Sequence, residues 1–196
     1  MIGIVSYLVF LATVASILAI AVLGLNLQWG NTGLFNGGVA AFFGAGAYGT
    51  LILGGGPQDG QLGGFGLFYP LALLGGMATA GLLAWGVGIL TLRLRHDYLA
   101  ISTFGIAVAF ENLMRNAQWL GGGAQGLRGF ERPLRAVLGD GFFYNILFLL
   151  CVLVLMVLTY RFLETLVASP FGRQLRAIRE DETAARSLGK IPARIR

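Results

Sequence analysis

Charge is almost missing from the first 92 of the 196 residues, where Asp59 is the only charged side chain. Every Lys and Arg lies from Arg93 onward. Charged residues make up 12% of the whole chain, against roughly 25% in average soluble proteins. Because a soluble surface needs charge throughout, this distribution excludes a soluble domain. It is typical of a chain that crosses a bilayer several times and ends in a basic cytoplasmic segment.

Cysteine, histidine and nucleotide-binding motifs are scarce or missing as well. Cys151 is the only cysteine, which excludes an intrachain disulfide. His96 is the only histidine, so no histidine metal site is expected. The sequence has no G-x-x-x-x-G-K-[ST] phosphate loop, and we expect no cofactor. The net charge of +5 comes from basic residues beside apolar segments, where membrane topology explains them, so nucleic acid is not an expected partner.

Apolar segments dominate what remains, and a chain of this length has room for about five spans. They cover residues 2–25, about 33–53, about 67–92, 98–120 and 142–162. The sequence therefore predicts an all-α, polytopic integral membrane helical bundle of about five spans with a short cytoplasmic helix. We place the membrane domain at residues 1–163 and a cytoplasmic segment at 164–196.

The basic residues predict the orientation of these spans. Arg93 and Arg95 follow the third segment, and the basic tail begins at Arg161, so both regions are expected in the cytoplasm. Two spans separate the regions, which makes their placement consistent. The N-terminus and the loop 54–66 then lie outside. The loop at 121–141 also lies outside, although it carries three arginines.

Small residues recur every four positions in the second and third segments. The two series are Gly33, Gly37, Ala41, Ala45 and Gly49, and Ala72, Gly76, Ala80, Ala84 and Gly88. Each forms a ridge along one helix face, which lets backbones approach closely. The ridges predict close helix packing, or an interface that slides or rocks.

The segment 28–38 combines polar residues with four glycines. Asn31, Thr32 and Asn36 lie there, at the entrance of the second span. Asparagine and glycine disfavour a continuous helix, so the segment predicts either a break or re-entrant turn, or an ordinary polar loop before a helix.

The fourth segment is the most polar. Glu111 and Arg115 are four residues apart in the order that favours an ion pair on a helix. Ionisable groups inside a membrane usually face a bundle interior or a water-filled cavity. Either these groups line a pathway, or the span ends early and both lie among the headgroups. The candidate translocation-path residues are Asn31, Asn36, Thr103, Glu111 and Arg115.

The basic tail predicts a capped helix from Ser169 to Leu188. Ser169 suits the N-cap and Pro170 the first helical position, while Gly189 suits the position just past the end. Phe171, Leu175, Ile178, Ala185 and Leu188 follow helical spacing, with Glu182 among them. Such a helix either lies on anionic lipid or docks on a cytoplasmic protein. The acidic run 180–182 favours a protein groove.

Three stretches of the chain resemble one family. Ala184 and Ala185 followed by Gly189 resemble the ATPase-contacting loop of ABC importer permeases. The form SPFGRQLRAIREDETAARSLG is similar to the permeases of branched-chain amino-acid importers, of the LivM type. LNLQWGNTGLFNGGVAAFFGAGAYG resembles that family's early span, and DYLAISTFGIAVAFENLMRN with the following GGGAQGLRG resembles its middle.

The resemblance implies a multi-pass transport subunit of the bacterial inner membrane rather than an enzyme. In contact with membrane lipid, it would pair with a homologous permease subunit and receive substrate from a periplasmic substrate-binding protein. Two ATP-binding subunits would hydrolyse ATP and dock on the segment 164–196. The implied coupling residues are Phe171, Leu175, Ile178, Glu182, Ala184, Ala185 and Gly189.

Several alternatives stay open. Permeases for urea or short amides are very similar to those for leucine, isoleucine and valine. A secondary transporter or channel independent of an ATPase would use Glu111 and Arg115 as an ion relay, and a third alternative is a membrane anchor without a transport role. Family members continue with several more spans, so the chain is expected to be a fragment or truncated product at its C-terminal end.

Overall fold

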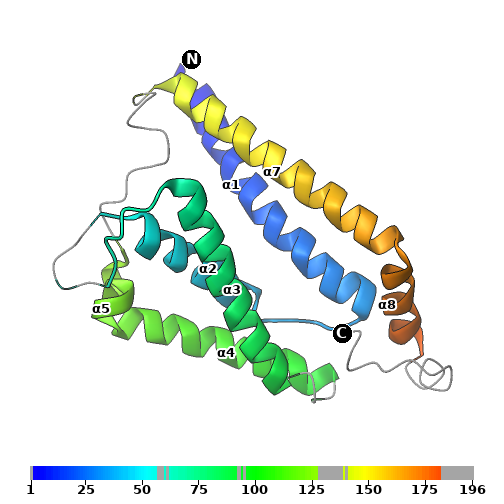
Figure 1. Cartoon of the computed structure of the whole chain (residues 1–196). Helices are drawn as coiled ribbons and strands as arrows, with labels where there is room; N and C mark the ends of the chain where they lie inside the picture. The colour runs from blue at the N-terminus through cyan, green and yellow to red at the C-terminus, as the bar shows by residue number, and fades with distance from the viewer. Residues whose placement is uncertain are drawn as a thin grey trace. The chain divides into compact units, whose positions relative to one another are not determined.

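The structure, a computed structural model, describes residues 2–56, 60, 62–91, 94, 96–127, 139 and 141–181, and every regular element in these ranges is helical. The elements are α1 (Ile2–Asn26), the π-helix η1 (Leu27–Thr32), α2 (Val39–Gly54), α3 (Tyr69–Thr91), α4 (His96–Asn116), α5 (Gln118–Gly121), the 3-10 helix η2 (Gly123–Gln125), α7 (Phe142–Ala168) and α8 (Pro170–Glu180) (Figure 1). They form two compact units: α1, η1, α7 and α8 in the first, and α2 to η2 in the second. The predicted all-α architecture is confirmed.

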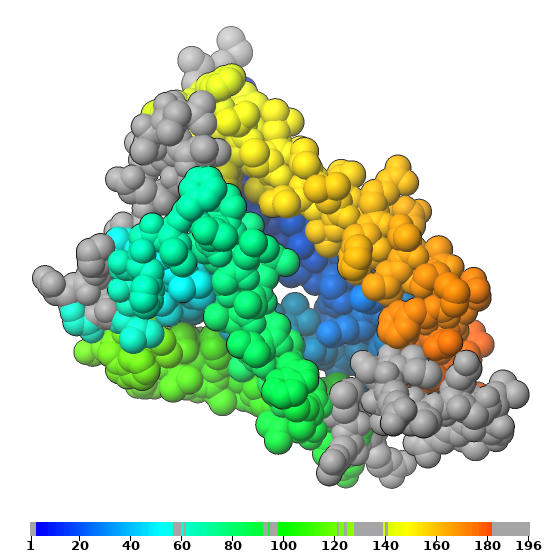
Figure 2. All heavy atoms as spheres, viewed as in Figure 1, coloured from blue at the N-terminus to red at the C-terminus, as the bar shows by residue number. Residues whose placement is uncertain are grey.

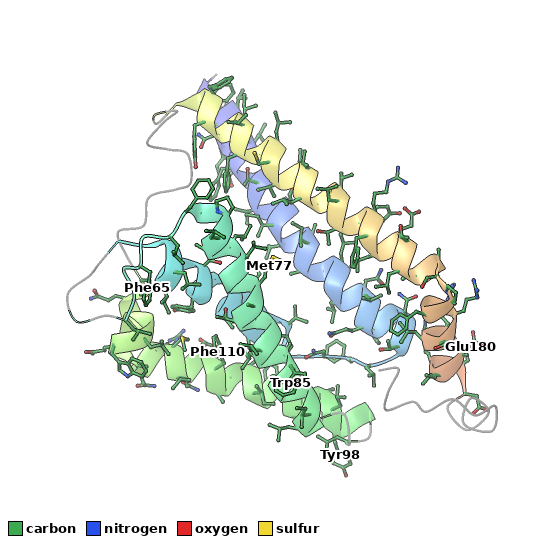
Figure 3. The ribbon with its side chains drawn as sticks, viewed as in Figure 1. Phe65, Met77, Trp85, Tyr98, Phe110 and Glu180 are labelled. Carbon is green, nitrogen blue, oxygen red and sulfur yellow. The ribbon has the colours of Figure 1, made fainter. Side chains whose placement is uncertain are left out.

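Three of the described helices are long and apolar enough to cross a membrane. They cover Gly3–Thr32, Tyr69–Thr91 and Phe142–Ala168. Large apolar side chains along them are exposed on the chain, among them Met77 and Trp85 on α3 (Figure 3). Exposed apolar surface of this extent is expected where lipid, rather than water, surrounds the helices. The polytopic membrane prediction is therefore confirmed.

The second and fourth spans differ from their predicted bounds. The second helix begins only at Val39, because the residues from Gly33 to Gly38 are not in a regular α-helix. The fourth ends at Asn116 instead of Leu120, since Ala117 leaves the helical region with φ −79° and ψ 82°. Both are helices, but neither is among the three that are long and apolar enough to span a membrane.

In the first unit α1 packs along α7, and both helices run in the same direction (Figure 1). Figure 2 shows the side chains of α1, in blue, against those of α7, in yellow to orange. The short helix α8 follows α7 and contacts both α7 and η1. The C-terminal ends of the first and fifth spans thus meet at α8, as the predicted orientation requires.

In the second unit α2 and α3 pack through small residues. A Cβ added at Gly46 would lie 3.5 Å from the Ala80 Cβ, and one at Gly54 would lie 2.9 Å from the Ala72 Cβ. Between these contacts, a Cβ at Gly76 would lie only 2.0 Å from the Thr50 Oγ1. These pairs run antiparallel, so the prediction of close helix packing is confirmed.

The N-terminal part of the first ridge was predicted wrongly. Gly33 and Gly37 lie before α2 begins, so they cannot belong to a ridge on that helix. Gly33 instead has φ +72°, the left-handed conformation that ends η1. On α2, the residues that contact Thr79 include Ala45, whose carbonyl accepts a hydrogen bond from the Thr79 Oγ1 at 3.1 Å.

Candidate functional site

The junction between α7 and α8 is a tight elbow. The Ser169 hydroxyl accepts a hydrogen bond from the Gly172 N–H at 3.4 Å and donates one to the Leu166 carbonyl at 2.6 Å, while Pro170 occupies the first helical turn. Both N-terminal predictions for this helix are confirmed. Gly172 lies directly against the end of α7, because a Cβ there would be 2.1 Å from the Val167 carbonyl oxygen.

The helix ends earlier than predicted. It stops at Glu180, where Asp181 is extended with φ −152° and ψ 104°, so the prediction of one helix continuing to Leu188 was wrong. A physical reason lies in the run of three carboxylates at 180–182. Negative charge at a helix C-terminus opposes the macrodipole, and aspartate is a poor helix former. Glu182, Ala184, Ala185 and Gly189 lie outside the described residues.

The apolar face of α8 is turned toward the chain itself. Leu175 and Ile178 are 3% and 2% exposed, and α8 packs against α7 and η1. In this structure the two side chains therefore anchor α8 and are not available to a cytoplasmic partner. Phe171 differs from them: it is 44% exposed. Of the predicted coupling residues that the structure describes, only Phe171 presents its side chain outward.

Three arginines of α8 bind backbone carbonyls at helix ends. Arg176 donates to the Val167 carbonyl at 3.2 Å and Arg173 to the Ala168 carbonyl at 3.5 Å, both at the end of α7. Arg179 donates to the Gly30 carbonyl in η1. The last carbonyls of a helix have no partner inside it, so these contacts supply the missing donors. No local sequence pattern marks Arg179 or connects it with Gly30.

Asn31 lies in the π-helical turn that ends the first span. Of the two interpretations of 28–38, the structure shows a break in the regular α-helix: η1 covers Leu27–Thr32, and Gly33 ends it. The Thr32 hydroxyl donates to the Gln28 carbonyl at 2.5 Å, and the Gly33 N–H donates to the Trp29 carbonyl at 3.1 Å. π-Helical turns within longer helices are rare and are frequent at functional sites.

Thr103 connects α4 with the residues that precede α2. Its side chain is 2% exposed, and its Oγ1 accepts a hydrogen bond from the Gly37 N–H at 3.0 Å. The Asn36 Oδ1 accepts from the Gly38 N–H at 2.8 Å, a local turn that fixes the same backbone. A Cβ at Gly38 would lie 3.0 Å from the Asn36 Oδ1 and 3.2 Å from the Thr103 carbonyl. The structure therefore brings the predicted residues Asn36 and Thr103 together.

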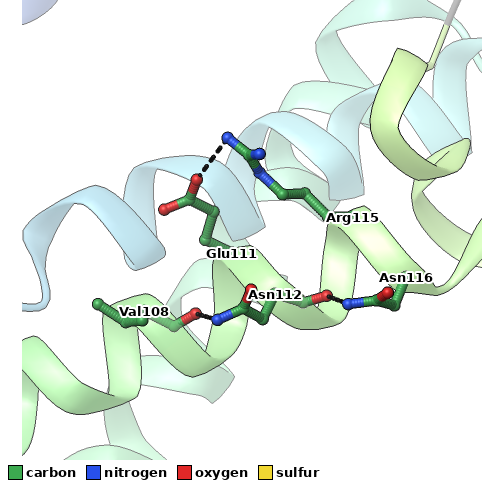
Figure 4. A network of polar contacts seen from close by, with 5 residues as sticks. All are labelled: Val108, Glu111, Asn112, Arg115 and Asn116. Carbon is green, nitrogen blue, oxygen red and sulfur yellow. Dashed lines mark hydrogen bonds and ion pairs between the residues drawn. The ribbon is translucent and has the colours of Figure 1, made fainter.

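Glu111 and Arg115 form the predicted ion pair on α4, at 2.8 Å (Figure 4). Their side chains are 60% and 66% exposed on the chain. Beside them, the Asn112 amide donates to the Val108 carbonyl at 3.0 Å, and the Asn116 amide donates to the Asn112 carbonyl at 2.8 Å. These contacts lie within one helix, so the polar face is open to whatever covers α4 in the membrane.

The five candidate path residues do not form one described cluster. Asn31 belongs to the first unit, and the other four belong to the second. In the described ranges no group of three or more His, Cys, Asp or Glu side chains could hold a metal ion. The arrangement therefore offers helix-end and interhelical polar contacts, which hold backbone segments in place.

These features define a polytopic helical membrane protein with a basic amphipathic helix after its last described span. The chain belongs to the family of permease components of branched-chain amino acid transport systems, whose sequence model matches residues 7–196. It is 35% identical to the high-affinity branched-chain amino acid transport system permease protein LivM of Escherichia coli (strain K12), over 95% of this chain and 47% of that protein. The LivM protein of Salmonella typhimurium matches with the same identity and coverage. The chain spans about half the length of these relatives. No solved structure matches the chain.

Proposed function

We propose that the chain forms part of the inner-membrane permease of an ABC importer for branched-chain amino acids. The observation that carries this proposal is the similarity to two proteins named as permeases of high-affinity branched-chain amino acid transport systems, over 95% of the chain. The family match extends through the basic tail to residue 196, so it includes the proposed coupling segment as well as the spans.

The proposed assembly has three kinds of partner besides lipid. A homologous permease subunit completes the translocation path, and a periplasmic binding protein delivers leucine, isoleucine or valine. Two ATP-binding subunits hydrolyse ATP and dock on residues 164–196. Closure of these subunits would push α8 and tilt the spans, a rigid-body form of alternating access.

The division of the coupling residues follows from burial. Leu175 and Ile178 hold α8 against its own chain, as their burial supports. Phe171, which is exposed, and the motif of Ala184, Ala185 and Gly189 would then contact the ATP-binding subunit. This arrangement separates an anchoring face from a docking face, so a push on the docking face reaches the spans through packed side chains.

For the translocation path we propose Asn31, Asn36, Glu111 and Arg115 as pathway-lining residues, with Thr103 beside them. The Glu111 and Arg115 side chains support a path because both are exposed on α4, where ionisable groups within a membrane would face an interior or a water-filled cavity. Thr103 has a different role, because its hydroxyl already holds the Gly37 backbone. We propose that it fixes the entrance of the second span next to Asn36.

Uptake by proteoliposomes tests the proposal. The chain is reconstituted with its partner permease, ATP-binding subunits and binding protein, and uptake of radiolabelled leucine is followed with and without ATP. We expect uptake only with ATP, with competition by isoleucine and valine and none by urea. Competition by urea or short amides instead would assign a different substrate class. Uptake driven by a proton gradient without ATP would overturn the ABC importer proposal in favour of a secondary transporter.

Docking is tested by substitution in the coupling motif. Ala185→Asp adds bulk and an unpaired charge at a proposed close contact, so it should abolish recovery of the ATP-binding subunit in a pull-down from membranes. Small docking surfaces concentrate their free energy in a few groups, each costing about 2 kcal/mol or more when disrupted. Ala177→Asp, at an exposed alanine of α8, adds the same charge elsewhere and should leave recovery unchanged. Undiminished recovery with Ala185→Asp would remove the docking role.

A further inference from the structure

Arg179 joins two parts of the chain that are 149 residues apart in sequence. Its guanidinium donates to the Gly30 carbonyl, and the aliphatic part of its side chain lies over Gly33, where an added Cβ would be 3.1 Å from the Arg179 Cγ. We call these two interactions the Arg179 contact. Both partners on the other side belong to the turn that ends the first span, so the contact ties α8 to the end of that span.

The Gly30 carbonyl is available because of how the first span ends. Its two preceding carbonyls are already used: Gln28 accepts from the Thr32 hydroxyl, and Trp29 accepts from the Gly33 N–H. Gly33 ends the turn in a left-handed conformation with φ +72°, and its missing side chain leaves room for the stem of Arg179. The turn therefore presents one further acceptor at a fixed place, toward α8.

The other end of α8 is held to α7. Gly172 lies against the Val167 backbone, Ser169 caps the helix, and Arg176 donates to the Val167 carbonyl. Leu175 and Ile178 are buried between these two attachments. Consequently α8 is attached to the C-terminal ends of two membrane spans. Arg179 supplies the polar contact with the first of them.

We propose that Arg179 is a positioning residue for coupling, which makes the π-helical turn η1 move together with α8 when a cytoplasmic partner displaces α8. This inference rests on the proposed function, because it needs an ATP-binding subunit to move the helix. Motion of α8 would then be transmitted along two routes. One is the covalent chain to α7, and the other is the Arg179 contact to the turn that carries Asn31. Without the contact, α8 would be joined to the turn only by apolar packing.

The functional test compares three variants in the reconstituted importer. Arg179→Gln removes the charged donor and should lower leucine uptake per ATP hydrolysed by about tenfold, the lower range for loss of a hydrogen bond to a charged group. The rate of ATP hydrolysis should change little, because Arg179 does not contact the nucleotide in this proposal. Arg179→Lys keeps a charged donor and should restore most of the coupling. Arg161→Gln, the matched control, removes the same charge near the C-terminal end of α7, where the Arg161 side chain is exposed and its ion pair with Glu164 lies within that helix, and it should retain coupling within about twofold.

A distance measurement tests the inference without transport. Spin labels are placed at Gln28 and Glu180, which are both exposed, in a Cys151→Ser background, and the distance between them is measured by pulsed electron paramagnetic resonance in nanodiscs. We expect one narrow distance that is the same in the nucleotide-free and ATP-bound complexes. Arg179→Gln should broaden it in both states.

The outcomes separate the two proposals. If the importer shows no ATP-dependent uptake, the proposed function fails. The distances measured without nucleotide in the unmodified chain and in Arg179→Gln still test whether Arg179 holds α8 to η1. A distance that shifts between the two states in the unmodified chain would overturn the inference, because α8 and η1 would then move apart. Equal loss of coupling in Arg161→Gln and Arg179→Gln would also overturn it, because the effect would then follow from the loss of a positive charge alone.

Discussion

Replacing Gly172 by alanine should release α8 from the end of α7. The added Cβ would lie 2.1 Å from the Val167 carbonyl oxygen and 2.6 Å from the Val167 Cα, whereas nonbonded carbon atoms approach to about 3.5 Å at their optimum. The nearest atoms belong to the backbone, so no side-chain rotation relieves the overlap. The elbow must open, and with it the cap of Ser169 is strained.

The size of the effect follows from the groups that the opening disturbs. Overpacking in a well-packed region typically costs about 1 to 3 kcal/mol, and the N-cap contributes about 1 kcal/mol more if it is lost. We expect the free energy that holds α8 in place to fall by about 2 kcal/mol. A change of that size raises the fraction of open molecules by about 30-fold. The described spans should still insert, because Gly172 lies after α7, the last of them in the described ranges.

Hydrogen exchange measured by mass spectrometry checks this prediction, because it reports local opening of α8. Amides of residues 173–180 should exchange about 30-fold faster in Gly172→Ala, while those in the middle of α7 should not change. Gly24→Ala is the matched control: Gly24 lies in α1, in the same unit, and an added Cβ there meets no atom within 4 Å. Unchanged exchange in Gly172→Ala would refute the elbow geometry and the attachment of α8 to α7 that depends on it.

Three further predictions concern the second unit. Thr103→Val should lower the free energy of unfolding in a detergent titration by about 1 to 2 kcal/mol because it leaves the partly buried Gly37 N–H without its acceptor, whereas Thr103→Ser should not; equal values for both would contradict the hydrogen bond. Glu111→Gln alone should reduce leucine uptake more than Glu111→Gln combined with Arg115→Gln, since the single change leaves an unpaired charge; equal, negligible effects would place both groups among the headgroups. Gly76→Ala should weaken the packing of α2 on α3 and lower thermal stability in detergent, while Gly86→Ala, whose added Cβ meets nothing within 4 Å, should not.

The number and kind of the main elements could be predicted from the sequence because they depend on local chemistry. Each predicted apolar segment contains a helix, since a backbone in lipid must satisfy its hydrogen bonds within the segment. The start of α8 was predictable for a similar reason: the Ser169 cap and Pro170 act within one turn. Packing of α2 on α3 was predictable from the small residues on both helices, because a ridge of small side chains lets two backbones approach closely.

The exact ends of helices were less predictable. At Glu180 the capping signals of Ser169 and Gly189 predicted a longer helix, but the acidic run between them opposes helix continuation. At Gly33 a regular four-residue spacing predicted membership of a ridge, but the left-handed conformation of that residue ends η1 instead. In both cases one local signal competes with another, and the sequence does not give their relative strength.

Tertiary structure alone decided which face of α8 is free. The spacing of Leu175 and Ile178 places them on one apolar face, but an apolar face packs equally well on a partner, on lipid or on its own chain. The same holds for Arg179 with Gly30 and for Thr103 with Gly37, whose members are 149 and 66 residues apart. Backbone carbonyls and amides occur at every position, so no residue type marks the one that a distant side chain will bind. Local chemistry determined the helices of this protein, and only the packing of distant segments determined which polar groups join their ends.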